Sequence, residues 1–429
     1  MLSVSTALAR LQDGLGESFP DSSGTRIIDI AFPLNDAFDP LLWCGQQAQW
    51  PQFYWQQRNG DEELAALGAV KTFSSLDAAN RFLCQTGRQD LRIGGLNAFE
   101  PQQGSLVLPR LEWHRCGGRA VLRLVLHSDI SLREDAATAR AFLASLTTTQ
   151  ATPGAIPPLL SERHSSDYSQ WQAMIARATK AISAGEMDKV VLARATDLQF
   201  AAPLDAVSIM AASRRSNLNC FHFLMAFNAR QAFFGSTPER LWRRRGALLR
   251  TEALAGTVAN HQEDAKAQQL ADWLMKDDKN QRENMLVVED ICQRLQSEAS
   301  TLDVLPPQVV RLRKVQHLRR CIWTELAAPD DSRCLLQLQP TAAVAGLPRR
   351  AALAFIQRHE PFAREWYAGS AGYLSLAQSE FCVALRSAKV DHDTLRLYAG
   401  AGIVSGSDAQ QEWQEIDNKA AGLRSLLCP

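Results

Sequence analysis

Lys189 stands where an amine could take part in acid–base chemistry. In the segment GEMDKVVLARAT, residues 185–196, it comes directly before a short apolar run. If this run is a strand, Lys189 shares one face with Val191 and Ala193, because side chains alternate between faces. A lysine accepts a proton only as the neutral amine, which burial and nearby cations favour. The alternative is a strand-end lysine whose ammonium group reaches water.

Glu239 could supply the matching acid. In GSTPERLWRRR, residues 235–245, it follows Pro238 at the end of an expected strand. Taken alone, a Pro–Glu pair at such a place predicts a solvated corner. Close to a lysine, the same carboxyl could stay protonated and act as a general acid toward a leaving group.

Carboxylates in two helical segments could hold a divalent cation. Glu283 lies in LMKDDKNQRENMLVVEDI, residues 274–291, whereas Glu412, Glu415 and Lys419 lie in QEWQEIDNKAAG, residues 411–422, on one helix face. Spacing alone favours an exposed ladder of charges. The competing interpretation takes Glu283 and Glu415 as Mg²⁺ ligands, because this ion prefers one or two carboxylates with waters and a substrate oxygen.

Three glycine-bearing segments could bring backbone N–H groups close to an anion such as a carboxylate. They are ALAGTVAN (253–260), PTAAVAGLP (340–348) and YAGAGIVSGS (398–407). None is a P-loop or a G-x-G-x-x-G motif, so the sequence gives no support for nucleotide binding.

The residues before a Thr- and Pro-rich connection at 147–162 show strand and helix patterns but no assignable chemistry. Strands are expected in TRIIDIAF (25–32), PQFYWQQ (51–57) and AVLRLVLH (120–127), and helices over 75–83 and 134–146.

After the connection, short turns join most of the expected strands, which favours antiparallel sheets with helices packed against them over a βαβ architecture. A helix stops at Gly185, another is expected over 203–215, and a long helical pattern at 263–299 is interrupted near 276–280. VRLRKVQHLRRCIWTEL (310–326) reads as a strand, and the last hundred residues as a helix, three strands and a final helix.

The composition excludes several classes of protein. Lys plus Arg and Asp plus Glu number 46 each, so no nucleic-acid partner is predicted. Nine scattered cysteines without a C-x-x-C motif predict reduced thiols and argue against a zinc or iron–sulfur site. The N-terminus does not resemble a signal peptide, and no apolar run reaches the roughly 20 residues of a membrane helix. A soluble, cytoplasmic protein is expected.

Taken together and in order, these segments resemble the chorismate-utilising enzymes, which include anthranilate, aminodeoxychorismate, salicylate and isochorismate synthases. The resemblance extends from about residue 166 to the end of the chain. It is carried by DKVVLAR, GSTPERL, EALAGT, DDKNQRENMLVVEDI, RKVQHL, QPTAAVAGLP, YAGSAGY, EFCVALRSA and YAGAGIVSGSDAQQEWQEIDNKAAGL.

The resemblance implies an α/β (α+β) fold, with two large, mostly antiparallel sheets packed together, helices outside and an active site in the cleft between the sheets. Residues 1–150 would be a variable N-terminal part that contributes strands to the same fold. Residues 151–429 would be the catalytic region, and the whole chain one structural domain.

The resemblance also implies an activity and its residues. Chain length and the N-terminal section are most similar to isochorismate synthases of menaquinone biosynthesis, which are isomerases that convert chorismate reversibly into isochorismate with Mg²⁺. Lys189 would activate water for attack at C2, and Glu239 would protonate the departing C4 hydroxyl. Glu283 and Glu415 would bind Mg²⁺ with Glu412 beside it. The substrate-binding residues would be Gly256, Thr257, His317, Tyr367, Arg386, Gly402 and Lys419.

Alternatives within the family stay open. Lys189 disfavours anthranilate synthase, where a non-basic residue admits ammonia, but it does not exclude a salicylate synthase or the aminodeoxychorismate branch. A siderophore-pathway isochorismate synthase also stays open, because that pathway shares this chemistry. A non-catalytic relative that binds chorismate is disfavoured because the acid, base and metal positions are all present. Gln339 replaces a histidine frequent in relatives, with little expected consequence, whereas Leu254 and Ala343 lie in substrate-facing segments. A monomer is expected.

Overall fold

The structure, a computed structural model, describes residues 3–32 and 38–427. Its strands are β1 (Gly24–Phe32), β2 (Gln52–Gln56), β3 (Glu62–Phe73), β4 (Ile93–Asn97), β5 (Gly104–Cys116), β6 (Arg119–Ser128), β7 (Leu159–His164), β8 (Lys189–Phe200), β9 (Phe221–Ala226), β10 (Gln231–Thr237), β11 (Arg240–Arg245), β12 (Leu248–Ala259), β13 (Ala299–Val304), β14 (Gln308–Arg311), β15 (Val315–Leu326), β16 (Gly346–Leu347), β17 (Ser370–Leu374), β18 (Gln378–Val383), β19 (Ser387–Asp391) and β20 (Thr394–Ile403). Its helices are α1 (Val4–Gly14), α2 (Pro40–Gly45), α3 (Leu76–Thr86), α4 (Leu132–Ala144), α5 (Tyr168–Ser183), α6 (Ala206–Ser216), α7 (Asp264–Lys276), α8 (Asp278–Leu295), α9 (Asp331–Leu338), α10 (Arg349–His359) and α11 (Ala409–Leu427).

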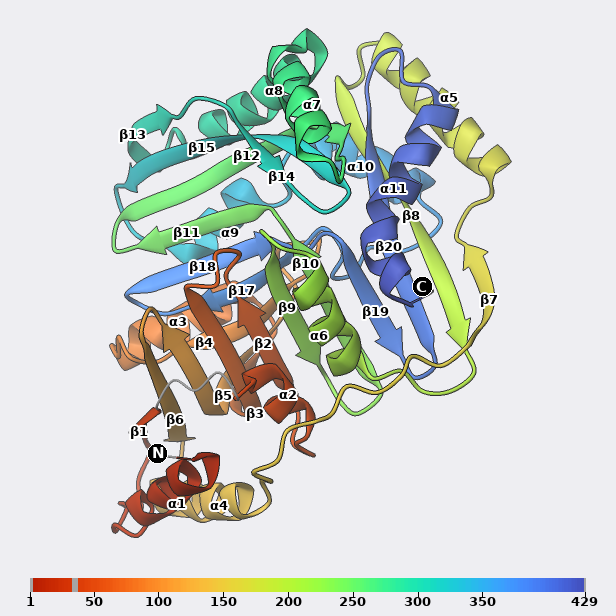
Figure 1. Ribbon diagram of the computed structural model, residues 1–429. Helices are drawn as coiled ribbons and strands as arrows, with labels where there is room; N and C mark the ends of the chain where they lie inside the picture. Colours follow the sequence, from red (N-terminus) through yellow and green to blue (C-terminus); the bar gives the residue numbers. More distant parts are fainter. Residues whose placement is uncertain (1–2, 33–37, 428–429) are drawn as a thin grey trace.

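Antiparallel pairing connects all these strands into one ladder that divides at β5. One edge of β5 pairs with β3, and the other edge pairs first with β4 and then with β6. The first arm runs through β3, β2, β9, β10, β19, β20 and β8, and the second arm through β4, β17, β18, β11, β12 and β15. Figure 1 shows the two arms as separate layers, with β8 and β20 in one and β12 and β15 in the other. The predicted antiparallel α/β fold is confirmed.

The chain crosses from one arm to the other between β10 and β11 and again between β18 and β19. The two crossovers contact each other through their backbones: Val383 N–H donates to Glu239 O at 3.0 Å, and Ser236 N–H donates to Arg386 O at 3.2 Å. These bonds satisfy backbone groups that have left the strand ladder. Glu239 and Arg386, both predicted site residues, therefore lie next to each other at the point where the arms join.

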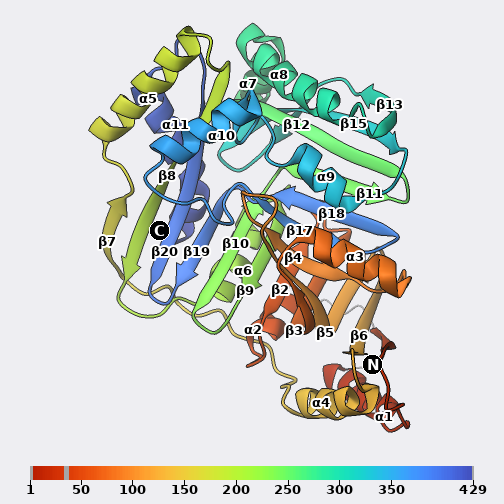
Figure 2. The same ribbon diagram turned by 180° about the vertical axis from the view of Figure 1, so that it is seen from behind.

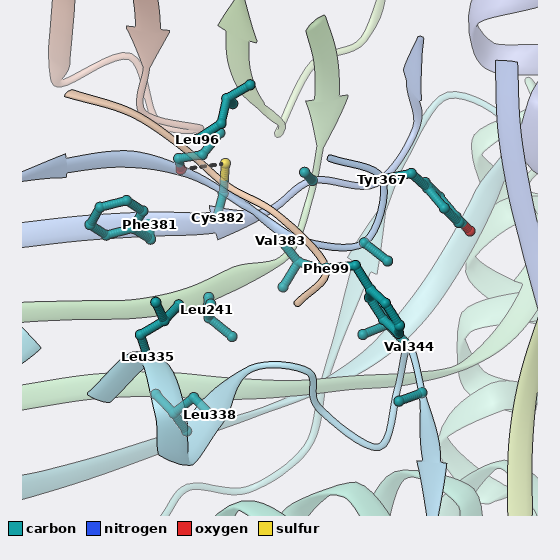
Figure 3. Packing of buried hydrophobic residues seen from close by; sticks show 14 of the residues in the cluster. Leu96, Phe99, Leu241, Leu335, Leu338, Val344, Tyr367, Phe381, Cys382 and Val383 are labelled. Atoms are coloured by element: carbon teal, nitrogen blue, oxygen red, sulfur yellow. Dashed lines mark hydrogen bonds between the residues drawn. The ribbon is translucent and has the colours of Figure 1, made fainter. Parts of the chain in front are cut away.

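Helices cover the outer faces of both arms. α8 packs on β12 and β15 of the second arm, and α11 packs on β20 of the first arm. Figure 2 shows α9 and α10 on the opposite side of the molecule, with α3 over the N-terminal strands. The largest apolar cluster joins residues from both arms and includes Leu96, Leu241, Phe381 and Val383, whose packing is visible in Figure 3.

Local sequence explains where α8 and α5 begin. The Asp277 side chain accepts a hydrogen bond from Asn280 N–H at 2.9 Å and so caps α8, which separates α8 from α7. The predicted interruption near 276–280 is therefore confirmed. α5 starts with a capping box between Asp167 and Gln170, and it ends before Gly185, which has a positive φ of 74°.

Several expectations differ from the structure in number or extent. Residues 310–326 form the turn-connected strands β14 and β15, because residues 312–314 form a tight connection. The last hundred residues contain helices α9, α10 and α11 and strands β16 to β20, which is more than predicted. The N-terminal strands β3, β4 and β5 carry no clear alternation because both of their faces are largely buried.

No described helix is long and apolar enough to cross a membrane.

We expect the chain to fold as one unit, because N-terminal strands fill positions inside the ladder of the C-terminal part. β2 pairs with β9, and β4 pairs with β17. A fragment of residues 151–429 would expose the free edges of both partner strands. Expressed alone, it should show no cooperative thermal transition by circular dichroism, and co-expression with residues 1–150 should restore one. A cooperative transition of the fragment alone would contradict this expectation.

Candidate active site

One cavity of about 970 Å³ collects every residue that the resemblance assigns to catalysis, substrate binding or metal binding. The residues arrive from both arms, both crossovers and two helices, and each lies in the cavity lining: Lys189 (β8), Gly402 (β20), Gly256 and Thr257 (β12), His317 (β15), Tyr367 (before β17), Glu239 and Arg386 (crossovers), Glu283 (α8), and Glu412, Glu415 and Lys419 (α11). The segments spread over more than half the chain thus form one site.

Lys189 is held at the start of β8 by a segment far along the chain. β16 pairs with it: Leu347 lies opposite Lys189, and Gly346 lies opposite Val190. Gly346 has φ 132°, and a Cβ there would come within 2.2 Å of the Lys189 carbonyl oxygen, so only glycine fits. Gly402 on the neighbouring strand leaves space for the amine, since a Cβ there would lie 3.0 Å from Lys189 Cε.

The surroundings of the Lys189 amine are less apolar than the sequence predicts. The side chain is almost completely buried, but its Nζ donates to Glu283 Oε1 at 3.0 Å. The amine therefore contacts a carboxylate that the resemblance also assigns to Mg²⁺. β-Strand alternation correctly predicted a buried side chain, and it could not predict a partner on α8.

Glu239 is a buried carboxyl kept in its protonated form near neutral pH. It is 2% exposed, and burial raises its pKa from 4.5 to about 8, with the charge of Glu252 acting in the same direction. Lys189 and Lys419 oppose this shift without cancelling it. A carboxyl with a pKa near 8 can donate a proton to a leaving group at neutral pH.

Two of the three glutamates that α8 and α11 place in the cavity lining, Glu283 and Glu415, are paired with lysines. Burial acts to raise the pKa of Glu283, but the neighbouring ammonium groups, Lys189 first, together hold that pKa below 4.5. Glu415 Oε1 lies 2.6 Å from Lys419 Nζ. Burial and the charge of Glu415 raise the pKa of Glu412. Three glutamates of the two helices thus line the cavity, and two of them are in ion pairs.

The carboxylates fit a Mg²⁺ site that the protein completes only in part. Among the described residues, no three His, Cys, Asp or Glu side chains are arranged to hold a metal ion by themselves. Mg²⁺ does not need such a cage, because it binds through one or two carboxylates and keeps several waters and a substrate oxygen. Glu283, Glu412 and Glu415 line the same cavity and supply oxygen donors of this kind.

His317 and Arg386 form a hydrogen-bonded chain whose proton positions follow from chemistry. An Arg386 guanidinium nitrogen lies 2.8 Å from His317 Nε2, and Thr257 Oγ1 lies 3.0 Å from His317 Nδ1. Arginine can only donate, so Nε2 accepts and the proton resides on Nδ1. Burial and Arg386 lower the pKa of His317 well below 6.5, which agrees with a neutral ring. In the described part of the chain, no carboxylate pairs with Arg386, so its charge is available to an anion.

α8 is anchored to β12 by asparagines that sequence reasoning did not select. Asn280 Oδ1 accepts from Thr257 N–H at 3.0 Å, so this backbone group is not free for a substrate. Asn284 is completely buried, and its amide donates to the carbonyl oxygens of Ala253, Ala255 and Leu318. Asn280 and Asn284 share one helix face with Glu283, and this spacing could have identified them from the sequence.

Tyr367 forms one wall of the cavity. Its ring stacks on Tyr398 with centroids 5.0 Å apart and an angle of 8° between planes. Figure 3 shows its hydroxyl at the edge of the apolar cluster, directed away from the other labelled side chains. A Cβ at Gly400 would lie 3.0 Å from this hydroxyl. Of the other positions noted in the sequence, Leu254 and Ala343 line the cavity, whereas Gln339 is buried elsewhere and donates to Ala98 O at 2.6 Å.

Comparison with known proteins places this geometry in a family. Residues 96–428 match the family described as chorismate binding enzyme. The chain belongs to the chorismate-binding enzyme family. The resemblance inferred from the sequence segments is therefore confirmed.

Individual chorismate-binding enzymes are similar to this chain over nearly its whole length. Isochorismate synthase MenF of Escherichia coli (strain K12) is 66% identical over 428 residues, covering 100% of this chain and 99% of that protein. Its solved structure, described as a menaquinone-specific isochorismate synthase, matches with a TM-score of 0.97 over 99% of both chains. Isochorismate synthase MenF of Haemophilus influenzae (strain ATCC 51907 / DSM 11121 / KW20 / Rd) is 40% identical, covering 91% of this chain and 90% of that protein.

A more distant structure shares the fold alone. Anthranilate synthase component I from Streptococcus pneumoniae TIGR4 matches with a TM-score of 0.66 and 20% identity, covering 98% of this chain and 97% of that chain. The antiparallel two-armed architecture is therefore common to chorismate-binding enzymes of very different sequence.

The raised pKa of Glu239 predicts a pH-dependent cost to folding. A carboxyl whose pKa rises from 4.5 in the unfolded chain to about 8 in the folded protein favours folding most below pH 4.5, and this contribution is lost as pH rises through 8. Glu239→Gln should therefore stabilise the protein increasingly between pH 5 and 8, by on the order of 3–5 kcal/mol at the plateau. Urea unfolding across this pH range measures the difference.

The exposed Glu186 provides the control for this measurement. Glu186→Gln should change the free energy of unfolding little at any pH, because its side chain stays in water in both states. A stability difference for Glu239→Gln that does not grow with pH would contradict the protonated carboxyl.

Proposed function

We propose that this protein is an isochorismate synthase that converts chorismate reversibly into isochorismate with Mg²⁺. The observation that carries the proposal is that Lys189 and Glu239, a buried amine and a buried carboxyl with a pKa of about 8, line the same cavity. Exchange of a hydroxyl between two ring carbons needs a base for the incoming water and an acid for the departing hydroxyl. This pair supplies both.

In the proposed reaction Lys189, as the neutral amine, takes a proton from the water that forms the new C–O bond at C2. Glu239 gives its proton to the C4 hydroxyl, which departs as water while both ring double bonds shift. One water enters and one water leaves, so substrate and product are isomers. Afterwards the proton on Lys189 and the charge on Glu239 return to their starting states through solvent, and the enzyme carries no net change.

The remaining cavity residues are proposed to bind the substrate's two carboxylates and the metal. Arg386, oriented by its hydrogen bond to His317, offers a guanidinium to one carboxylate. Lys419, which donates to Gly400 O at 2.9 Å, is held where it can contact the substrate. Mg²⁺ held by Glu283 and Glu415, with Glu412 beside it, would neutralise the ring carboxylate and remove the negative charge that faces Lys189.

The relatives support a role in menaquinone biosynthesis. The Escherichia coli protein with 66% identity is described as a menaquinone-specific isochorismate synthase, and this similarity covers the N-terminal part as well as residues 151–429. We further propose that the enzyme acts in the cytoplasm as a monomer. The scattered cysteines fit a reducing compartment, and a single chain provides the whole cavity lining.

The purified protein, incubated with chorismate and Mg²⁺, should yield isochorismate until a fixed ratio of the two compounds is reached from either direction. Proton NMR of the mixture identifies the product. EDTA should stop turnover, and added Mg²⁺ should restore it, because Glu283 and Glu415 then bind the ion again. Salicylate and pyruvate as main products would replace this proposal with a salicylate synthase, and no turnover with Mg²⁺ would favour a non-catalytic relative.

Lys189→Ala should lower kcat by roughly a hundredfold or more, because the attacking water loses its base. The far-UV circular dichroism should be unchanged. Lys389→Ala is a matched control, since Lys389 is also a strand lysine paired with a glutamate, at 2.7 Å from Glu365, and it lies outside the cavity lining. Near-normal turnover of Lys189→Ala would refute its assignment as the base.

A further inference from the structure

Arg58 reaches from the N-terminal part of the chain to the crossover that carries Glu239. It lies in the turn between β2 and β3, which belong to the first arm. Its Nη1 donates to the carbonyl oxygen of Pro238 at 2.8 Å, the residue directly before Glu239. Its guanidinium also binds both carboxylate oxygens of Glu252, at 2.5 and 2.8 Å. One side chain thus connects the first arm, the crossover and β12 of the second arm.

These contacts are buried behind the cavity. The side chain of Arg58 is 9% exposed and that of Glu252 is fully buried, and the guanidinium lies 5.4 Å from the ring centroid of Phe221. Neither Arg58 nor Glu252 belongs to the cavity lining. A buried bidentate hydrogen bond between a guanidinium and a carboxylate fixes both the distance and the orientation of the two groups. An uncompensated charge there would be costly.

Glu252 also affects Glu239 through its charge, in addition to the contacts that Arg58 makes with Glu252 and Pro238. Burial acts to raise the pKa of Glu252, but Arg58 first and Arg240 next hold it below 4.5, so Glu252 is an anion. Arg240 N–H also donates to Glu252 Oε1 at 2.8 Å. This anion is the charged group that acts with burial to raise the pKa of Glu239.

We propose that Arg58 is a positioning residue for the acid of the reaction: it holds the Pro238 carbonyl and compensates the Glu252 carboxylate, and so fixes where Glu239 points and how readily it gives up its proton. The proposal rests on the proposed function, in which Glu239 protonates the departing hydroxyl. It gives the N-terminal part a role in the reaction, although none of its side chains that the structure describes lines the cavity.

The charged groups around Glu239 decide the direction of the expected changes. Glu252 on β12 raises the pKa of Glu239, whereas Lys189 on β8 and Lys419 on α11 lower it. On the opposite side, Glu380 on β18 is occupied by Arg240, with 2.8 Å between the charged atoms. Removing Arg58 leaves Glu252 less compensated and should raise the pKa of Glu239. Removing the Glu252 charge should lower it.

The experiment compares kcat, KM and the pH profile of kcat for the wild type, Arg58→Gln, Arg58→Lys and Glu252→Gln. Arg58→Gln should lower kcat at least tenfold, because a displaced catalytic group loses rate without loss of binding, and KM for chorismate should stay within about threefold. Its alkaline limb should move to higher pH, and that of Glu252→Gln to lower pH. Arg58→Lys keeps the charge but not the planar fork, so its kcat should fall less and its limb should stay in place.

Arg110→Gln is the matched control. Arg110 is another buried arginine of the N-terminal part with a two-pronged bond to a carboxylate, Asp135, and it lies away from the cavity. It should lose stability without a change in the pH profile. The proposal is overturned if Arg58→Gln loses no more kcat than Arg110→Gln. It is also overturned if the alkaline limb of the kcat profile lies at the same pH in the wild type, Arg58→Gln and Glu252→Gln. Should Arg58→Gln fail to fold, Arg58→Lys and Glu252→Gln decide the same questions.

A direct titration separates this proposal from the proposed function. Carbon-13 NMR of glutamate-labelled protein, with Glu239→Gln to assign the signal, reports the pKa of Glu239 without substrate. Opposite displacement of that pKa in Arg58→Gln and Glu252→Gln would support the positioning role even if the wild type failed to form isochorismate. An unchanged pKa in a wild type that does form isochorismate would overturn the positioning role alone.

Discussion

The structure depends on an antiparallel ladder that stays continuous while its two arms diverge. The arms separate at β5 and are tied together again where the chain crosses between them, at Glu239 and at Arg386. Regular pairing ends at these two places, so side chains there can face a cavity without interrupting a sheet. Glu239 and Arg386, two of the residues in the proposed site, lie at these crossovers.

The charges around the cavity follow from burial. Lys189 is paired with Glu283, and Lys419 with Glu415, since an unpaired buried charge is costly. Glu239 avoids the same cost by remaining protonated, and Arg386 keeps a positive charge that a neutral histidine orients. A substrate with two carboxylates and a divalent cation would together bring no net charge into this cavity. Each would replace a contact between two protein groups with a contact of its own.

The sequence predicted which residues share the cavity, but it did not predict the contacts between them. Ordered segments identified Lys189, Glu239 and Glu283 as members of one site, and helical periodicity gave the common face of Glu412, Glu415 and Lys419. The ion pair between Lys189 and Glu283 could not be read from the chain, because it depends on where α8, which packs on β12 and β15, places Glu283 relative to the start of β8. Arg58 carried no signal in the sequence, and the long-range pairing of β2 with β9 brings it to Pro238.

Arg386 has a backbone φ of 48°, in the left-handed region that costs a non-glycine residue roughly 1–2 kcal/mol. Glycine would adopt this conformation without the penalty but would provide no guanidinium. Under the proposed role of Arg386, the position sets thermal stability against activity. An engineering campaign that ranks variants by melting temperature alone would favour glycine here and lose the guanidinium proposed to bind a substrate carboxylate. Selection for heat resistance in this enzyme has to be coupled to an assay of turnover.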